Sequence, residues 1–158
     1  DAFAKLKEKE SKARLLIVPR HPERFDKVSL LTDKFASENT LSWHRYSKRQ
    51  GLDSDIVVVD TLGELVNLYA ISDKVILGGA FEPIGGHNGA EAAQFGCKII
   101  SGEHYFNQKD IFKAISDITI ATKDELSDVL LSHGELKPSM LKYKVNINMI
   151  IESIKDVL

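Results

Sequence analysis

Cysteine and long apolar runs are nearly absent from this sequence. Cys97 is the only cysteine among 158 residues, which excludes an internal disulfide and fits a reducing cytoplasm. Because Cys97 opens an apolar strand, we expect its thiol to be buried and unreactive. No stretch of 18 consecutive apolar residues occurs, so the sequence predicts no membrane-spanning helix.

An excess of charge and the common catalytic motifs are also missing. The net charge is −2, from 21 Lys and Arg against 23 Asp and Glu, which argues against a nucleic-acid binder because such proteins neutralise phosphates with a basic excess. The segment 44–50 predicts either a weakly basic surface or an ordinary solvated loop. There is no P-loop, no nucleophile elbow and no G-x-G-x-x-G after the first strand. The five histidines show no metal-ligand spacing, so we expect no metal.

Apolar runs of strand length alternate with amphipathic segments, a pattern typical of βαβ units around a parallel sheet. The runs are rich in Val, Ile and Leu, which indicates strands buried on both faces. We therefore predict an α/β fold, a Rossmann-like doubly wound parallel sheet in a single domain spanning 1–158. Residues 1–13 resemble a helix already under way, so we expect a piece of a longer protein. Strands are predicted at 14–18, 40–44, 55–60, 74–79, 98–100 and 118–120, and helices at 22–36, 62–70, 88–95, 108–115, 123–132 and 138–157.

Four loops rich in glycine or polar residues follow the predicted strands. In open α/β sheets, ligands bind beyond the carboxyl ends of the strands, so we expect these loops to converge on one site. The loops are PRHPER (19–24), DTLGEL (60–65), GGAFEPIGGHN (78–88) and SGEHYFNQ (101–108).

The third loop has the most specific pattern. Gly85 and Gly86 precede a predicted helix start at Asn88, where unpaired amides and the helix dipole attract a phosphate or carboxylate. The alternative is structural: the glycines form a tight turn with positive φ, Asn88 is the N-cap, and Glu91 completes a capping-box-like pair. Glu82 adds a carboxylate before the glycines, which a cap does not require. Spacing alone leaves both interpretations open.

The first loop places Arg20 and His21 at the tip of the first strand, and Pro22 begins the next helix. Arg20 can supply planar, bidentate donors to a phosphate, and His21 can stack on a base or bond to it. The plain alternative is a surface arginine beside a solvated histidine.

Two further helix starts are predicted from capping residues. Thr61 and Glu64 match a capping box, although Gly63 between them costs helix stability, and close approach of a ligand to the backbone would explain that glycine. Asn107 in the fourth loop predicts another N-cap.

Three segments resemble the carboxyl-terminal domain of the 3-deoxy-D-manno-oct-2-ulosonic acid (Kdo) transferases of lipopolysaccharide synthesis, which are GT-B glycosyltransferases of Gram-negative bacteria. The segments are LLIVPRHPERF, DTLGELVNLYAISDKVILGG and PIGGHNGAEAAQFGCKIISGEHYFN. The similarity runs in order from about residue 14 to residue 112. The chain departs from the family at Gly89 and Ala92, where proline is usual.

The resemblance implies one half of a GT-B enzyme. This half would hold the donor CMP-Kdo, while a missing amino-terminal domain would hold the lipid A precursor and supply the general base. Transfer would be inverting, with no metal or other cofactor, no catalytic residue in this chain and no activity of this domain alone. The full-length protein would work at the cytoplasmic face of the inner membrane and contact it mainly through the missing half. The implied substrate-binding residues are Arg20 and His21 on the CMP part, the backbone at Leu62 and Gly63, Gly85, Gly86, His87 and Asn88 around the phosphate, and Glu91 on the ribose hydroxyls.

Two other functions stay open. Another GT-B enzyme that uses a UDP-sugar, either a transferase or a UDP-N-acetylglucosamine 2-epimerase, shares the glycine loop and the glutamate. A Rossmann-like interaction module would use the same loops only as caps and turns.

Overall fold

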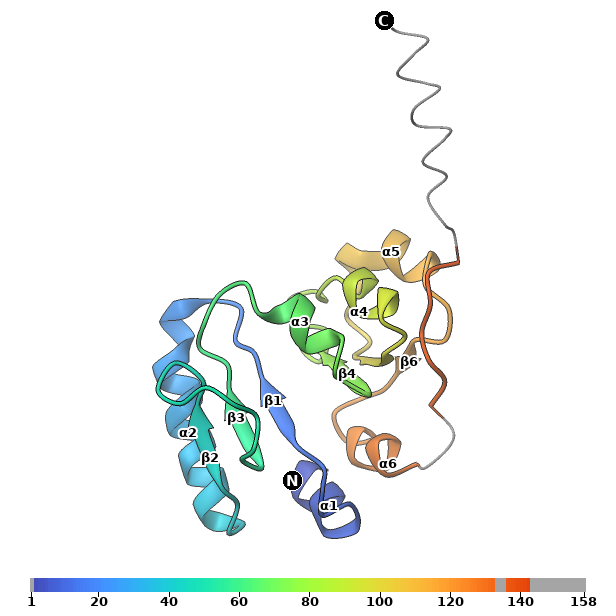
Figure 1. Cartoon of the computed structure of the whole chain (residues 1–158). Coiled ribbons are helices and arrows are strands. Elements are labelled where there is room, and N and C mark those ends of the chain that lie inside the picture. Colours follow the sequence, from blue (N-terminus) through green and yellow to red (C-terminus); the bar gives the residue numbers. More distant parts are fainter. Residues whose placement is uncertain (1, 133–135, 143–158) are drawn as a thin grey trace, which may run out of the picture. The chain divides into compact units, whose positions relative to one another are not determined.

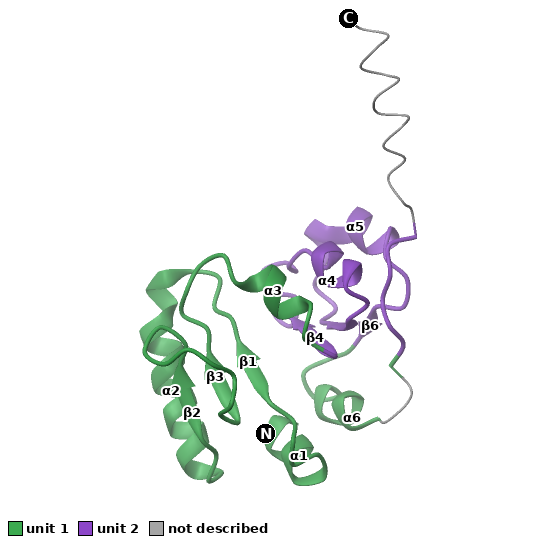
Figure 2. Ribbon diagram, in the orientation of Figure 1, with its two compact units in different colours: residues 1–72, 121–136 green, residues 73–120, 137–158 purple. Residues whose placement is uncertain are grey.

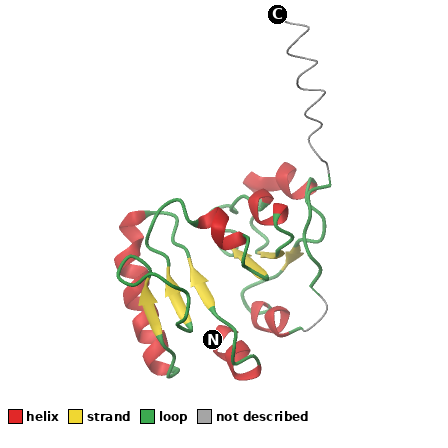
Figure 3. Cartoon of the chain, in the orientation of Figure 1, coloured by secondary structure: helices red, strands yellow, loops and turns green. Residues whose placement is uncertain are grey.

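The computed structural model describes residues 2–132 and 136–142, and the chain divides into two compact units (Figure 2). Unit 1 comprises Asp1–Ser72 and Ala121–Leu136, and unit 2 comprises Asp73–Ile120 and Lys137–Leu158. In the described residues each unit has a three-stranded parallel sheet with helices beside it (Figure 3).

Unit 1 is built around its central strand, β3. The sheet has the order β1-β3-β2, and all its strands are parallel. Because successive strand residues point to opposite faces, β3 packs into two apolar clusters. Ile56 packs with residues of α1 and α2, and Val57 packs with Leu68 of α3. The elements are α1 (Ala2–Lys9), β1 (Leu15–Ile17), η1 (Pro22–Arg24), α2 (Phe25–Glu38), β2 (Trp43–Arg45), β3 (Ile56–Val58), α3 (Leu65–Tyr69) and α6 (Leu126–Leu131), labelled in Figure 1 except for the short 3-10 helix η1.

Unit 2 has the strand order β4-β5-β6, again all parallel. Its central strand, β5, contributes the fully buried Ile99 and Ile100. Cys97, just before β5, is 1% exposed, and burial raises the pKa of its thiol, so the predicted buried thiol is confirmed. The elements are β4 (Lys74–Leu77), α4 (Ala90–Gln94), β5 (Lys98–Ser101), η2 (Phe106–Gln108), α5 (Lys109–Lys113) and β6 (Thr119–Ile120).

The predicted α/β class with parallel strands is confirmed, and each predicted strand overlaps an observed one. The structure differs in sharing the strands between two sheets; a single domain stays a prediction. The helix predicted at 138–157 is wrong over 138–142, because Ser139 donates its N–H to Cys97 O and Leu141 pairs with Ile115 as an isolated antiparallel bridge. The rest of that helix lies outside the described residues. Within the described ranges no helix has the length and hydrophobicity to cross a bilayer.

Candidate functional site

The predicted site residues fall into two groups, one in each unit. In unit 1, β1 and β3 are parallel neighbours with Ile17 opposite Val58, so the loops that follow them leave the same edge of the sheet. In unit 2, Leu77 of β4 lies opposite Ser101 of β5, so their loops also share an edge. The convergence of all four loops stays a prediction.

Arg20 and His21 lie on the exposed turn after β1. Arg20 makes no hydrogen bond or ion pair with any residue in the described part of the chain. The Nδ1 atom of His21 lies 3.9 Å from Oε1 of Glu23. Pro22 is the first residue of η1, as predicted. The guanidinium of Arg20 is therefore available for an anionic ligand.

The loop after β3 does not form the predicted capping box. The helix α3 begins only at Leu65, and the buried Oγ1 of Thr61 has no hydrogen-bond partner among the described residues. The reason is Gly63, whose φ of +89° takes the backbone off a helical path. No atom lies within 4 Å of the position that a Cβ of Gly63 would occupy. The positive φ alone accounts for this glycine, and Leu62 beside it is 70% exposed.

Asp60, which is not among the predicted site residues, is a buried carboxylate at this edge. Its side chain is 1% exposed, and its carboxylate accepts hydrogen bonds from Ser47 N (2.8 Å), Ser47 Oγ (2.5 Å) and Arg45 Nε (2.6 Å). Burial favours the protonated carboxyl, but the bonds from Ser47 and Arg45 outweigh it and lower the pKa of Asp60. A lone aspartate directly after the apolar run at 56–59 was the available sequence signal.

Arg45 joins this carboxylate to a second one. Its Nη1 lies 2.7 Å from Oδ1 of Asp26, and the bonds to Asp60 and Asp26 raise the pKa of the guanidinium. The segment 44–50 is therefore not simply a free basic surface, because one of its cations neutralises a buried carboxylate.

In unit 2, the loop after β4 is folded onto itself. Glu82 donates its N–H to Gly79 O (3.0 Å), and Ile84 donates its N–H to Glu82 O (2.7 Å). The imidazole of His87 lies beside Gly78, where a Cβ would be 3.6 Å from the ring. The two backbone bonds fix the course of the segment 79–84.

Asn88 and Glu91 are the exposed polar residues where this loop leads into α4. The helix begins at Ala90, two residues later than predicted, and Oδ1 of Asn88 accepts the N–H of Ala90 (2.8 Å). The N-cap is Gly89, so the predicted N-cap role of Asn88 is wrong, although its side chain accepts the first N–H of the helix. Glu91 makes no hydrogen bond within the described residues, so the capping-box-like pair does not form. The N–H of Asn88 likewise has no acceptor among them.

Gly85 and Gly86 are buried, and Asn107 occupies the space beside them. The N–H of Gly86 donates to Oδ1 of Asn107 (2.8 Å), and Nδ2 of Asn107 donates back to Gly86 O (3.0 Å). Asn107 lies inside η2, whose N-cap is Tyr105, so its predicted role as an N-cap is wrong. Contact of the two glycines with a phosphate stays a prediction, and the Gly86 amide already has an acceptor.

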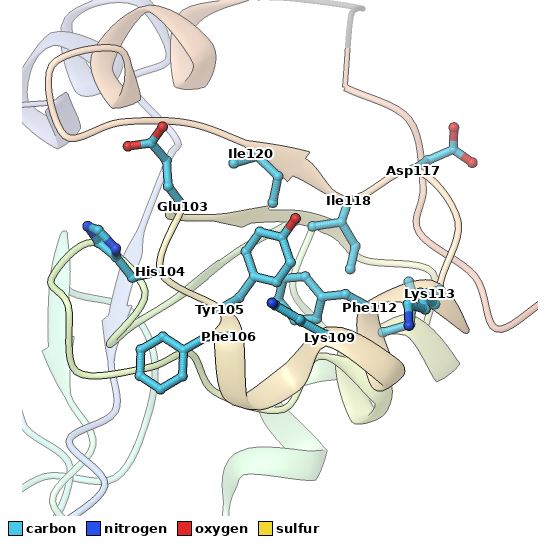
Figure 4. Close-up of a pocket in the computed structure, with 11 residues that line it drawn as sticks. Glu103, His104, Tyr105, Phe106, Lys109, Phe112, Lys113, Asp117, Ile118 and Ile120 are labelled. Atoms are coloured by element: carbon cyan, nitrogen blue, oxygen red, sulfur yellow. The ribbon is translucent and has the colours of Figure 1, made fainter.

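A cavity of about 690 Å³ lies in unit 2, between the segment 103–113 and the segment that leads into β6 (Figure 4). The ring of Tyr105 stacks on Phe112, with centroids 4.7 Å apart and planes 17° from parallel. None of the nine predicted site residues lines this cavity. The lining residues are Glu103, His104, Tyr105, Phe106, Lys109, Phe112, Lys113, Ile115, Asp117, Ile118 and Ile120.

Parallel strands followed by glycine-rich loops at their carboxyl edges place the chain among Rossmann-like α/β domains. Within the described residues, no group of three His, Cys, Asp or Glu side chains lies close enough to hold a metal ion. No protein-family model matches the chain.

Comparison with known proteins narrows this class. The chain is 36% identical over 106 residues to 3-deoxy-D-manno-octulosonic acid transferase of Haemophilus influenzae, covering 66% of this chain and 24% of that protein. It is 37% identical over 102 residues to the Bordetella pertussis enzyme of the same name, covering 61% of this chain and 22% of that protein. The chain therefore spans about a quarter of the length of these relatives.

A solved structure agrees with these relatives. The carboxyl-terminal CMP-Kdo binding domain of WaaA from Acinetobacter baumannii matches with a TM-score of 0.70 and 30% identity, over 82% of this chain and 69% of that one. This chain belongs to the 3-deoxy-D-manno-octulosonic acid transferase family and corresponds to its carboxyl-terminal domain.

Proposed function

We propose that this chain is the donor-binding part of a Kdo transferase, which holds CMP-Kdo while Kdo passes to a lipid A precursor. The main support is the match to the CMP-Kdo binding domain of WaaA over 82% of this chain. We place the acceptor site, the general base and most membrane contact in the part of the protein outside this chain. We expect the full-length protein to work at the cytoplasmic face of the inner membrane.

Within unit 2, we assign the donor to the surface made by Asn88 and Glu91. Both residues are exposed, and neither the N–H of Asn88 nor the carboxylate of Glu91 has a hydrogen-bond partner in the described residues. The amide of Asn88 would donate to the phosphate, and Glu91 would accept the ribose hydroxyls. His87 borders this surface, while the buried Gly85 and Gly86 would act by shaping the loop.

Within unit 1, the roles of the four predicted residues rest on the resemblance. Arg20 is exposed and unpaired within the described residues, which suits donation to the phosphate oxygens. His21 would contact the CMP part. The open space beside Gly63 suits approach of the donor to the backbone at Leu62 and Gly63.

The proposed reaction is an inverting transfer without a metal. A sugar hydroxyl of the acceptor attacks the anomeric carbon of Kdo from the side opposite to CMP, the general base outside this chain takes the hydroxyl proton, and the bond from that carbon to the phosphate oxygen breaks. Negative charge then grows on the departing CMP. Arg20 and the Asn88 amide would stabilise that charge, which lowers the barrier.

Titration of the 158-residue chain with CMP, UMP and ADP tests this proposal. We expect CMP to bind at least tenfold more tightly than the other two nucleotides. Equal or undetectable binding of all three would overturn the proposal, and a preference for uridine nucleotides would favour a UDP-sugar enzyme. We also expect no Kdo transfer by this chain alone, and turnover would contradict that expectation.

Substitutions separate binding from folding. Glu91→Ala and Arg20→Ala should each weaken CMP binding by about tenfold while the free energy of unfolding changes by less than about 1 kcal/mol, because both side chains are exposed. Glu38→Ala, which removes an exposed glutamate from α2, should leave CMP binding unchanged. If Glu91→Ala and Arg20→Ala behave like this control, their roles on the donor are wrong.

A further inference from the structure

The side chain of Asn107 binds both hydrogen-bonding groups of one backbone residue, 21 positions earlier in the chain. Its Oδ1 accepts the N–H of Gly86, and its Nδ2 donates to the carbonyl of Gly86. The N–H of Gly86 belongs to the peptide group shared with Gly85 and its carbonyl to the peptide group shared with His87, so the two bonds fix both planar groups. The loop after β5 thereby fixes the loop after β4.

The glycine pair is shaped to receive this side chain. Gly85 has a φ of +98°, and a Cβ built there would lie 2.8 Å from Oδ1 and 2.9 Å from Cγ of Asn107. A Cβ on Gly86 would lie 3.3 Å from Cβ of Tyr105. The absence of both Cβ atoms therefore makes room for the segment that holds Asn107.

The segment that holds Asn107 is itself anchored. The ring of Tyr105 stacks on Phe112 of α5, and the N–H of Gln108 donates to Tyr105 O (2.8 Å). His104 donates its N–H to Ala80 O (2.9 Å), at the start of the β4 loop. Asn107 thus projects from a supported backbone, as a residue that positions another loop requires.

We propose that Asn107 is a positioning residue for the donor site, which fixes the peptide groups on both sides of Gly86 and so holds the segment leading to Asn88 with the Asn88 amide facing the donor phosphate. This inference rests on the function proposed above. An amide suits this task because it offers one acceptor and two donors without charge. A carboxylate at this place could not donate to Gly86 O, and it would bring a negative charge close to the phosphate.

The test compares Asn107→Ala and Asn107→Asp with the wild-type chain. Both variants should bind CMP at least tenfold more weakly at a temperature where thermal unfolding shows them to be folded. The Gly86 amide should exchange with solvent at least tenfold faster in Asn107→Ala. Asn107→Asp has nearly the same volume as the wild-type side chain, and a loss of CMP affinity that persists at about 1 M salt, where charge repulsion is screened, decides the question if Asn107→Ala does not fold.

The control and a second ligand separate positioning from general stability. Asn39→Ala removes an asparagine that donates from Nδ2 to a backbone carbonyl, that of Phe35, at the end of α2, and it should change neither measurement. Cytidine lacks the phosphate, so its affinity, measured by competition with CMP, should fall less than twofold in Asn107→Ala. Equal losses for CMP and cytidine would overturn the positioning role.

The two proposals fail in different ways. If the wild-type chain binds CMP and both Asn107 variants bind it equally well, the positioning role is wrong and the proposed function stands. If the wild-type chain does not bind CMP, the proposed function is wrong and the positioning role falls with it.

Discussion

Different kinds of side chain hold the loops at the carboxyl edge of the sheet in each unit. In unit 1, a buried carboxylate, Asp60, ties the ends of β2 and β3 together through Arg45 and Ser47. In unit 2, a neutral amide, Asn107, ties the loops after β4 and β5 together through Gly86. A buried carboxylate needs several donors to offset its desolvation, whereas Asn107 is an uncharged side chain on an exposed residue and carries no such cost. The edge of unit 2, where we assign the Asn88 amide to the phosphate, is therefore fixed without a buried negative charge.

The largest effect should come from removing the carboxylate in unit 1. Asp60→Ala leaves Arg45 and Ser47 without their shared acceptor, so we expect the free energy of unfolding to fall by about 4 kcal/mol, measured by denaturant titration. Asp26→Ala removes the other acceptor of Arg45, but that side chain is 87% exposed, and we expect a loss below about 1 kcal/mol. Similar losses for the two variants would show that burial does not distinguish the carboxylates.

The next effect concerns the glycine on which the amide clamp of unit 2 depends. Gly85→Ala adds a Cβ at positive φ and places it 2.8 Å from Oδ1 of Asn107, so we expect a loss of about 3 kcal/mol. Gly63→Ala is a matched control in unit 1, because its φ of +89° is similar and its Cβ would meet nothing within 4 Å. That variant should lose only about 1 kcal/mol. Equal losses in thermal unfolding would mean that contact with Asn107 adds no cost.

Acid should act on unit 1 before unit 2. At the opposite edge of the unit 1 sheet, just before β3, Nζ of Lys7 lies 2.6 Å from Oδ1 of Asp55. Bonds from Lys7 and Ser42 lower the pKa of Asp55 to about 2. The folded-state pKa lies below the ordinary value of 3.8, so the stabilisation is complete above about pH 5 and is lost as the pH falls towards 2. The shift corresponds to about 2 kcal/mol.

Amide exchange as a function of pH measures this difference. Between pH 5 and 2, the amides of β3 should lose protection before those of β5, because the lowered pKa of Asp60 acts in the same direction. Asp55→Asn should remove part of this pH dependence. Earlier loss in β5 would contradict the assignment of the charged network to unit 1.

The sequence predicted the fold where the pattern is local and missed contacts that join distant residues. Runs of Val and Ile identified β3 and β5 because burial on both faces leaves a direct imprint on composition. The role of Asn107 depends on Gly86, 21 residues away, and the extended path of Ser139 depends on its bond to Cys97 O. Neither partner can be identified from the spacing of residues along the chain.

Two copies of one short motif show this limit most directly. Their comparison gives the prediction with the smallest expected change in unfolding free energy. Both Thr61 to Glu64 and Thr122 to Glu125 fit a capping box, and only the first was predicted to form one. In the structure Thr122 and Glu125 bond reciprocally, with Thr122 N donating to Glu125 Oε2 (2.9 Å) and Glu125 N donating to Thr122 Oγ1 (3.3 Å).

Substitution of each threonine tests which copy forms the box. Thr122→Ala should cost about 1 kcal/mol of unfolding free energy, because it removes the hydroxyl partner just before α6. Thr61→Ala should cost almost nothing, because its Oγ1 is buried without a partner in the described residues. The reverse order in denaturant titrations would restore the box before α3 and contradict the finding that Thr61 Oγ1 has no partner in the described residues. The positive φ of Gly63 explains why the first copy does not form the box, since it turns the backbone between Thr61 and α3 off the helical path.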